Sequence, residues 1–256
     1  MPPSFARIAP SYDALRPLSR ADRERLQRLV QDASLTAGDT VVEVGCGTGR
    51  LTLPMAALTP AQVIGIDSEA RMLEVSRSKD EARRVEWILG SAYRLPLPDG
   101  RASLVLMAMV VHLLRQRGRA FGEARRILRP GGRLHVWTFT PRHVQDFYLN
   151  EYFPSIPRID GPRFPSPEVL TAELRRAGFE WVKTEIQEEP RRLQIAEVVD
   201  RVRGRYISTL AMLPPLEYRL GLQRLEEALA DDRSIQFWQR TEWALLSAQR
   251  SQEPAA

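Results

Sequence analysis

An apolar run that leads into three closely spaced glycines is the strongest constraint on the fold of this 256-residue chain. The string Val41-Val42-Glu43-Val44-Gly45-Cys46-Gly47-Thr48-Gly49 is followed by apolar residues at helical spacing. This order predicts a buried strand, a tight turn and a helix. Glycines at such a turn permit positive φ angles and let a ligand approach the backbone closely. The stretch therefore predicts a ligand-binding corner of an α/β fold.

The spacing of the glycines indicates which ligand fits. A dinucleotide fingerprint requires G-x-G-x-x-G, whereas Gly49 comes one residue early and Arg50 stands where that motif needs a small residue. The spacing therefore disfavours NAD and FAD. The alternative interpretation is a glycine-rich turn that only joins a strand to a helix.

An acidic residue just before G-x-G-x-G resembles the first motif of the class I S-adenosylmethionine-dependent methyltransferases, with Glu43 as the acid. Two later strings strengthen the resemblance to the type 11, small-molecule group of these enzymes: Leu-Pro-Leu-Pro-Asp at residues 95–99 and Leu-Arg-Pro-Gly-Gly-Arg-Leu at residues 128–134. The resemblance implies a Rossmann-like, doubly wound, mostly parallel sheet of seven strands, the last antiparallel. It also implies S-adenosyl-L-methionine as cofactor.

An acid ends the second predicted strand, residues 62–67. A carboxylate at that place, Asp67, can accept two charge-assisted hydrogen bonds from a ribose diol. Both nucleotide-binding families use such an acid, so Asp67 supports an adenosine ligand without choosing between them. A helix is expected behind it over residues 68–78.

The resemblance assigns further cofactor contacts. Where the family usually has an Asp to accept from the adenine amino group, this chain has Ser91, whose uncharged hydroxyl should contribute less. Met72 can pack on adenine or in the core of its helix, and Tyr12 can contact the methionine end or plug the edge of the sheet. The predicted cofactor-binding residues are Tyr12, Arg16, Glu43, Gly45, Cys46, Gly47, Gly49, Asp67, Ser68, Met72, Ser91, Ala92, Met107 and Ala108.

The long apolar run at residues 103–114 predicts a central parallel strand buried on both faces. The family often opens this strand with Phe-Asp, but this chain has Ala102-Ser103. His112 follows the strand tip and is the candidate catalytic residue, as a general base or an acceptor-positioning group. The alternative is a histidine that only caps a helix.

Aromatic residues and prolines crowd residues 140–167, after the fifth predicted strand, residues 133–139. This segment should emerge where open α/β folds bind ligands, unless it is a surface loop that packs its own aromatics. Helical periodicity over residues 193–229, broken near Gly204 and at Pro214-Pro215, predicts an insertion that covers the acceptor site or forms a dimer surface. The predicted acceptor contacts are Tyr148, Tyr152, Arg203 and Tyr206.

Composition excludes several other classes. One cysteine and three scattered histidines leave no disulfide framework and make a metal centre improbable, so no metal is expected. The sequence has no run of about 18 apolar residues, so neither a signal peptide nor a membrane span is predicted. The expected location is the cytoplasm, with no membrane partner. The net charge of +5 comes from arginines interleaved with acids along helices. That pattern favours a solvated surface over a nucleic-acid partner.

One domain is predicted over residues 1–256. Its parts are an N-terminal helical cap (1–38), a cofactor-binding core (39–189) with a sixth strand at 179–188, an α-helical insertion (190–233) and a final strand (234–250). The predicted activity is in-line methyl transfer to a small-molecule acceptor. The alternatives are a cofactor-binding protein that has lost turnover and, less favoured, an RNA or protein methyltransferase. A homodimer is a further prediction about partners, and the sequence does not decide whether one forms.

Overall fold

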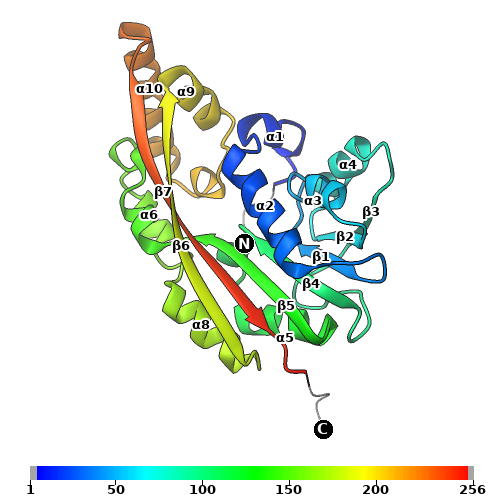
Figure 1. The fold of residues 1–256 in the computed structure, drawn as a ribbon. Helices are drawn as coiled ribbons and strands as arrows, with labels where there is room; N and C mark the ends of the chain where they lie inside the picture. Colours follow the sequence, from blue (N-terminus) through cyan, green and yellow to red (C-terminus); the bar gives the residue numbers. More distant parts are fainter. Residues whose placement is uncertain (1–4, 253–256) are drawn as a thin grey trace.

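Seven strands form one sheet in the computed structural model, which describes residues 5–252 (Figure 1). The strands lie in the order β3-β2-β1-β4-β5-β7-β6. Strands β1 to β5 pair in parallel, and β7 lies antiparallel between β5 and β6. The bounds are β1 Thr40–Val44, β2 Gln62–Asp67, β3 Val85–Leu89, β4 Ala102–Ala108, β5 Leu128–Phe139, β6 Trp181–Gln194 and β7 Gln236–Gln249. The predicted doubly wound fold is confirmed.

Helices separate most consecutive strands, although β4 follows β3 without a helix between them. They are α1 Tyr12–Leu15, α2 Arg20–Ala33, α3 Thr52–Leu58, α4 Ala70–Lys79, α5 Arg117–Ile127, α6 Pro141–Gln145, α7 Ile156–Asp160, α8 Pro167–Arg176, α9 Ile195–Arg203 and α10 Pro215–Asp231, with short 3₁₀ segments η1 Ala9–Ser11, η2 Val111–Leu113, η3 Tyr148–Glu151 and η4 Ser208–Ala211. Helix α2 begins at a capping box, in which Ser19 Oγ accepts from the Asp22 N–H at 3.0 Å. This box fixes the start of the helix.

Alternating residues of the central strands pack on opposite faces of the sheet. Val41 and Leu104 belong to one buried cluster with Leu26 of α2. Their neighbours Val42 and Val105 belong to a second cluster, which contains residues of α5 and α8. Both faces of the sheet are therefore covered, and the carboxyl ends of β1, β2 and β4 remain as the place for a ligand.

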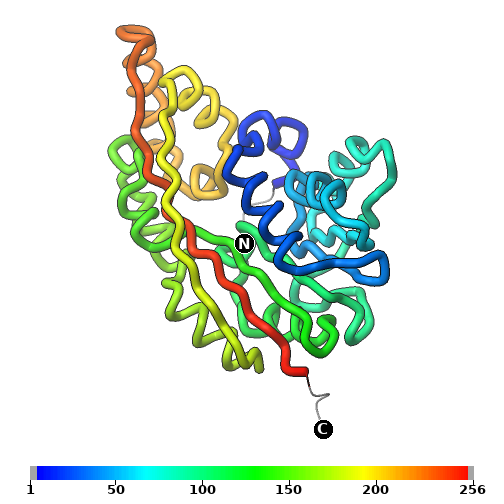
Figure 2. Tube along the Cα trace, viewed as in Figure 1, coloured from blue at the N-terminus to red at the C-terminus, as the bar shows by residue number. Residues whose placement is uncertain are grey.

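Strands β6 and β7 form a long ribbon that continues past the rest of the sheet, as the adjacent yellow and red traces of Figure 2 show. Strand β5 pairs with β7 only as far as Trp243, whereas β6 follows β7 to the pair Gln194 and Gln236. The predicted end of the sixth strand before Pro190 is therefore wrong: the strand runs through Pro190, and the helical part of the insertion begins at Ile195. Proline is tolerated there because β6 is an edge strand.

The insertion has a core of its own. Val198 and Val202 of α9 pack with Leu225 of α10, with Leu193 of the ribbon and with Phe153. The helical segments break near Gly204 and before Pro215, as the periodicity predicts. The segment at 140–167 contains the short helical pieces α6, η3 and α7, which the sequence pattern did not indicate. No helix within residues 5–252 is long and apolar enough to cross a membrane.

Candidate active site

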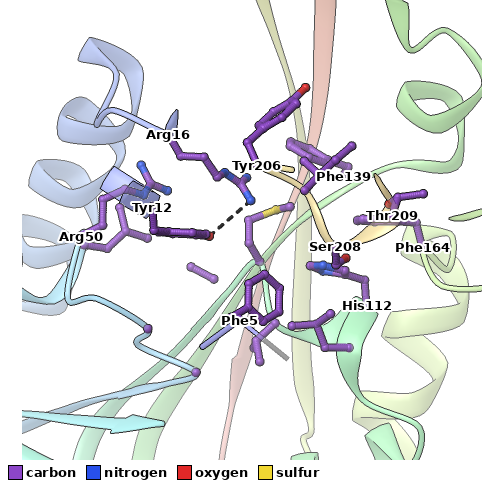
Figure 3. Close-up of a pocket in the computed structure, with 18 of the residues that line it drawn as sticks. Phe5, Tyr12, Arg16, Arg50, His112, Phe139, Phe164, Tyr206, Ser208 and Thr209 are labelled. Carbon is purple, nitrogen blue, oxygen red and sulfur yellow. Dashed lines mark hydrogen bonds between the residues drawn. The ribbon is translucent and has the colours of Figure 1, made fainter. Parts of the chain in front are cut away.

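A cavity of about 520 Å³ lies at the carboxyl ends of β1, β2 and β4 (Figure 3). This volume is typical of small-molecule sites. Its walls come from the glycine loop after β1, from the N-terminal segment, from the ends of β4 and β5, from the β6–β7 ribbon and from the insertion. The cavity thus lies between the core of the fold and the insertion, for which the sequence left open a role as a cover or as a dimer surface.

The glycine loop has the backbone that its sequence predicts. Gly45, Gly47 and Gly49 have φ angles of +76°, +54° and +74°. A Cβ at Gly45 would lie 2.5 Å from Val110 Cγ2, whereas a Cβ at Gly47 would meet nothing within 4 Å. Gly47 therefore exposes its backbone to the cavity, and a ligand can approach it closely.

Asp67 fixes the glycine loop from the tip of β2. Its Oδ2 accepts from the Gly47 N–H at 2.7 Å, and its Oδ1 accepts from the Glu69 N–H at 2.8 Å. The side chain also lines the cavity. Burial raises the pKa of Asp67, while these backbone bonds oppose that rise. Each oxygen keeps a further lone pair for a ligand hydroxyl.

Glu43 is buried on β1 and also lines the cavity. Thr52 Oγ1 donates to its Oε2 at 2.5 Å. Burial raises the pKa of Glu43 to about 8, and this effect outweighs the lowering by Thr52 and Arg50. The carboxyl is therefore mostly protonated at neutral pH, and a cationic ligand would favour its ionised form.

The N-terminal segment closes one side of the cavity. Tyr12 and Arg16 both line it, and Arg16 Nη1 donates to Tyr12 Oη at 3.3 Å. Asp13 anchors this segment by accepting from Thr48 Oγ1 of the glycine loop at 2.5 Å and by pairing with Lys79 of α4. The anchoring positions both cavity-facing side chains against the glycine loop.

The opposite half of the cavity is mostly aromatic. Phe139 lies 4.6 Å from Trp243 and 5.9 Å from Phe164, measured between ring centroids. The His112 ring stacks on Phe164 at 4.6 Å and 12° (Figure 3). Burial, with Arg163 and Arg16 nearby, holds the pKa of His112 well below its usual value. The imidazole is therefore neutral at pH 7, and its buried Nδ1 has no hydrogen-bond partner among the described residues.

Most predicted site residues line the cavity: Tyr12, Arg16, Glu43, Gly45, Cys46, Gly47, Asp67, Ser68, Met72, Ser91, Ala92, Ala108, His112, Tyr148 and Tyr206. The other four do not. Gly49 packs under Trp87, which lies 2.5 Å from the place of a Cβ. Met107 is buried in the core because the alternation of β4 turns it away from the face of Ala108.

Two predicted acceptor contacts, Tyr152 and Arg203, lie outside the cavity. Tyr152 stands under Arg224, whose guanidinium carbon is 5.0 Å from its ring centroid. A 3₁₀ segment has three residues per turn, so Tyr152, four residues after Tyr148, does not lie on the same face. Arg203 pairs with Glu226 at 2.8 Å, with 52% of its side chain exposed. Arg201 lines the cavity instead, because residues two apart on a helix point in nearly opposite directions.

Several wall residues were not predicted from the sequence. They are Phe139 and Phe164, the ribbon residues Gln239, Thr241 and Trp243, and the polar group Asp160, Ser208 and Thr209. The aromatic crowding at 140–167 indicated Phe164 in general terms. No local pattern marks the polar group, because its members come together only through the tertiary fold.

Comparison with known proteins identifies the family. A family of methyltransferase domains matches residues 42–136. A demethylmenaquinone methyltransferase of Thermus thermophilus is 34% identical over 199 residues, which are 68% of this chain and 90% of that protein. The chain belongs to the class I methyltransferase family. This methyltransferase is also 34% identical to a malonyl-[acyl-carrier protein] O-methyltransferase of Yersinia pestis, over 68% of this chain and 73% of that protein.

A solved structure shares the fold of this methyltransferase. It is a phosphoethanolamine N-methyltransferase 2 of Haemonchus contortus in complex with S-adenosyl-L-methionine, with a TM-score of 0.64 and 16% identity, covering 95% of this chain and 57% of that chain. The names of these proteins differ in the acceptor. Membership of the family therefore establishes a methyltransferase and leaves its acceptor to be inferred from the cavity.

Proposed function

We propose that this methyltransferase transfers the methyl group of S-adenosyl-L-methionine to a small, flat and largely apolar acceptor. The observation that carries the proposal is the continuity of the cavity. The glycine loop with Asp67 lines one half of it, and the aromatic rings around His112 line the other. Cofactor and acceptor would then lie in contact without water between them, and such positioning supplies much of the acceleration of a methyl transfer.

The residues of the first half fit S-adenosylmethionine. Asp67 stands where a ribose diol can donate to it, and the Gly47 backbone is open to close approach. Arg16 has donors to spare for the methionine carboxylate, since its side chain makes a single hydrogen bond in the described structure, to Tyr12 Oη. The positive charge of the bound cofactor would favour the ionised form of the Glu43 carboxyl. When bound, the cofactor supplies an electrophilic methyl group, and these residues bind and orient it.

The residues of the second half fit a planar ring. Phe139, Phe164 and Trp243 offer apolar faces, and the neutral imidazole of His112 can accept a proton or position a polar group. The relative named for demethylmenaquinone acts on a ring compound, which agrees with such a wall. The cytoplasmic location, the single-domain organisation and a homodimer stay predictions from the sequence.

Titration calorimetry tests the cofactor assignment. We expect saturable binding of S-adenosylmethionine and S-adenosylhomocysteine, and binding of NAD weaker by at least about tenfold, because the early third glycine does not form the dinucleotide turn. Saturable NAD binding without binding of the sulfonium cofactor would overturn the proposal. Cofactor binding without any consumption across phenols, quinols, amines and thiols would instead favour a binding protein that has lost turnover.

A further inference from the structure

A polar cluster interrupts the aromatic half of the cavity. Arg163 donates from Nη2 to Ser208 Oγ at 2.6 Å and from Nη1 to Asp160 Oδ1 at 2.7 Å. Thr209 Oγ1 donates to Asp160 Oδ2 at 2.7 Å. Asp160, Ser208 and Thr209 line the cavity, and Figure 3 shows Ser208 and His112 at the same end of it. The cluster joins the end of α7 to η4 of the insertion.

The donors and acceptors of this cluster can be counted. A guanidinium only donates, so Ser208 Oγ must accept from Arg163. The proton of Thr209 is already given to Asp160. Ser208 is only 9% exposed. Its hydroxyl proton nevertheless has no acceptor among the described residues. The cluster therefore presents one uncommitted hydroxyl proton to the cavity, on an oxygen polarised by a charge-assisted bond.

The charges nearest His112 at this end of the cavity are cationic. Besides burial, Arg163 and Arg16 disfavour protonation of His112, although Arg163 is also paired with Asp160 at 2.7 Å. The neutral His112 ring carries no charge of its own, so the two arginines can interact with an anion at this place. One face of the His112 ring stacks on Phe164. Charge interactions are stronger in a partly buried cavity than at a surface, so an anionic oxygen would be stabilised here.

Resting on the proposed function, we propose that Ser208, held by Arg163, donates its hydrogen bond to a ring-borne oxyanion of the acceptor, a phenolate or an enolate. A single free donor suits one oxygen better than a carboxylate, which presents two. The aromatic wall accommodates the ring that carries the oxygen, and the acceptor leaves its hydroxyl proton in solvent on binding. Ionisation makes the oxygen and the neighbouring ring carbon nucleophilic. Ser208 is then the specificity-determining contact and Arg163 a positioning residue.

The probe for this proposal is 4-nitrophenol, because its phenolate absorbs visible light and its phenol does not. With saturating S-adenosylhomocysteine, we expect the protein to bind the phenolate and to lower the apparent pKa of the probe by about one unit. Ser208→Ala should weaken phenolate binding by about tenfold and abolish the shift, since a hydrogen bond to a charged group is lost. Arg163→Lys should give a smaller loss, because it keeps the charge but not the fork.

Two controls separate folding from recognition. Ser78→Ala removes a hydroxyl that bonds Val75 O on the exposed side of α4, and it should bind the probe as the wild type does. The affinity of Ser208→Ala for S-adenosylhomocysteine should also equal that of the wild type. Binding of the neutral phenol, unchanged affinity in Ser208→Ala, or preference for 4-nitrobenzoate would overturn this inference and leave the proposed function standing. Failure of the wild type to bind S-adenosylhomocysteine would overturn both.

Discussion

Replacing Asp67 with alanine is expected to weaken binding of S-adenosylmethionine by roughly 100-fold, about 3 kcal/mol. The loss has two parts. The variant removes the carboxylate that a ribose diol would bond, and it removes the acceptor that holds the Gly47 N–H at 2.7 Å. Hydrogen bonds to a charged group are each worth about 1.5–3 kcal/mol. Titration calorimetry on the purified protein measures the change.

Two matched variants separate these parts. Asp67→Asn keeps one oxygen that can still accept from Gly47, so its loss should be nearer tenfold. Ser91→Ala should cost less than about fivefold, because Ser91 is exposed and, within residues 5–252, its Oγ accepts only from the Tyr93 N–H at 3.2 Å. A loss at Ser91 equal to or larger than that at Asp67 would contradict the assignment of the ribose carboxylate.

The half of the cavity proposed for the cofactor was predictable because its signals are local. The glycine loop needs positive φ at Gly45 and Gly47, and only glycine takes such angles without cost, so the sequence shows the turn directly. The position of Asp67 follows from the end of one apolar run. Parallel strands bring their carboxyl ends to one edge, so two local motifs that are distant in sequence meet without further information.

The acceptor half was predictable only in outline. Aromatic composition located its segments, but the rotation of each helix about its axis depends on packing that no short pattern encodes. Arg201 lines the cavity and Arg203 faces solvent because α9 packs its apolar stripe on α10 and the ribbon. The bond between Arg163 and Ser208 spans 45 residues and joins the turn after α7 to η4. Neither α7 nor η4 is long enough to show a periodicity that predicts its orientation.

The two halves differ for a physical reason. A glycine turn is determined by backbone sterics, which act within a few residues. The insertion is determined by its own buried cluster, in which residues of η3, α9, α10 and the ribbon pack together. The extension of β6 through Pro190 also depends on distant residues, because its partner strand β7 begins more than 40 residues later. Sequence patterns therefore predict the glycine-loop half of the cavity better than its aromatic half.

Replacing Glu43 with glutamine is expected to stabilise the ligand-free protein at neutral and alkaline pH. Burial raises the pKa of Glu43 from 4.5 to about 8, so between these values the folded state keeps a proton that the unfolded state has lost. The free energy of unfolding of the wild type therefore falls as pH rises through this window, by up to about 1.4 kcal/mol per pH unit. Glutamine resembles the protonated acid and does not titrate, so the gain should reach a few kcal/mol near pH 8.

Urea unfolding of both proteins from pH 4 to pH 9 measures this difference. The two proteins should have nearly equal stability below pH 4.5, where Glu43 is protonated in both the folded and the unfolded wild type. Above that pH the stabilities should diverge, until the advantage of Glu43→Gln levels off near pH 8. Glu81→Gln, which changes an acid on the surface, should run parallel to the wild type over the same range. The wild type should also bind S-adenosylmethionine more tightly as pH rises through 8, since a cation favours the ionised carboxyl, whereas Glu43→Gln should lack that rise. Parallel stability profiles for Glu43→Gln and the wild type would show that Glu43 is ionised in the folded protein, in contact with a cation or with water.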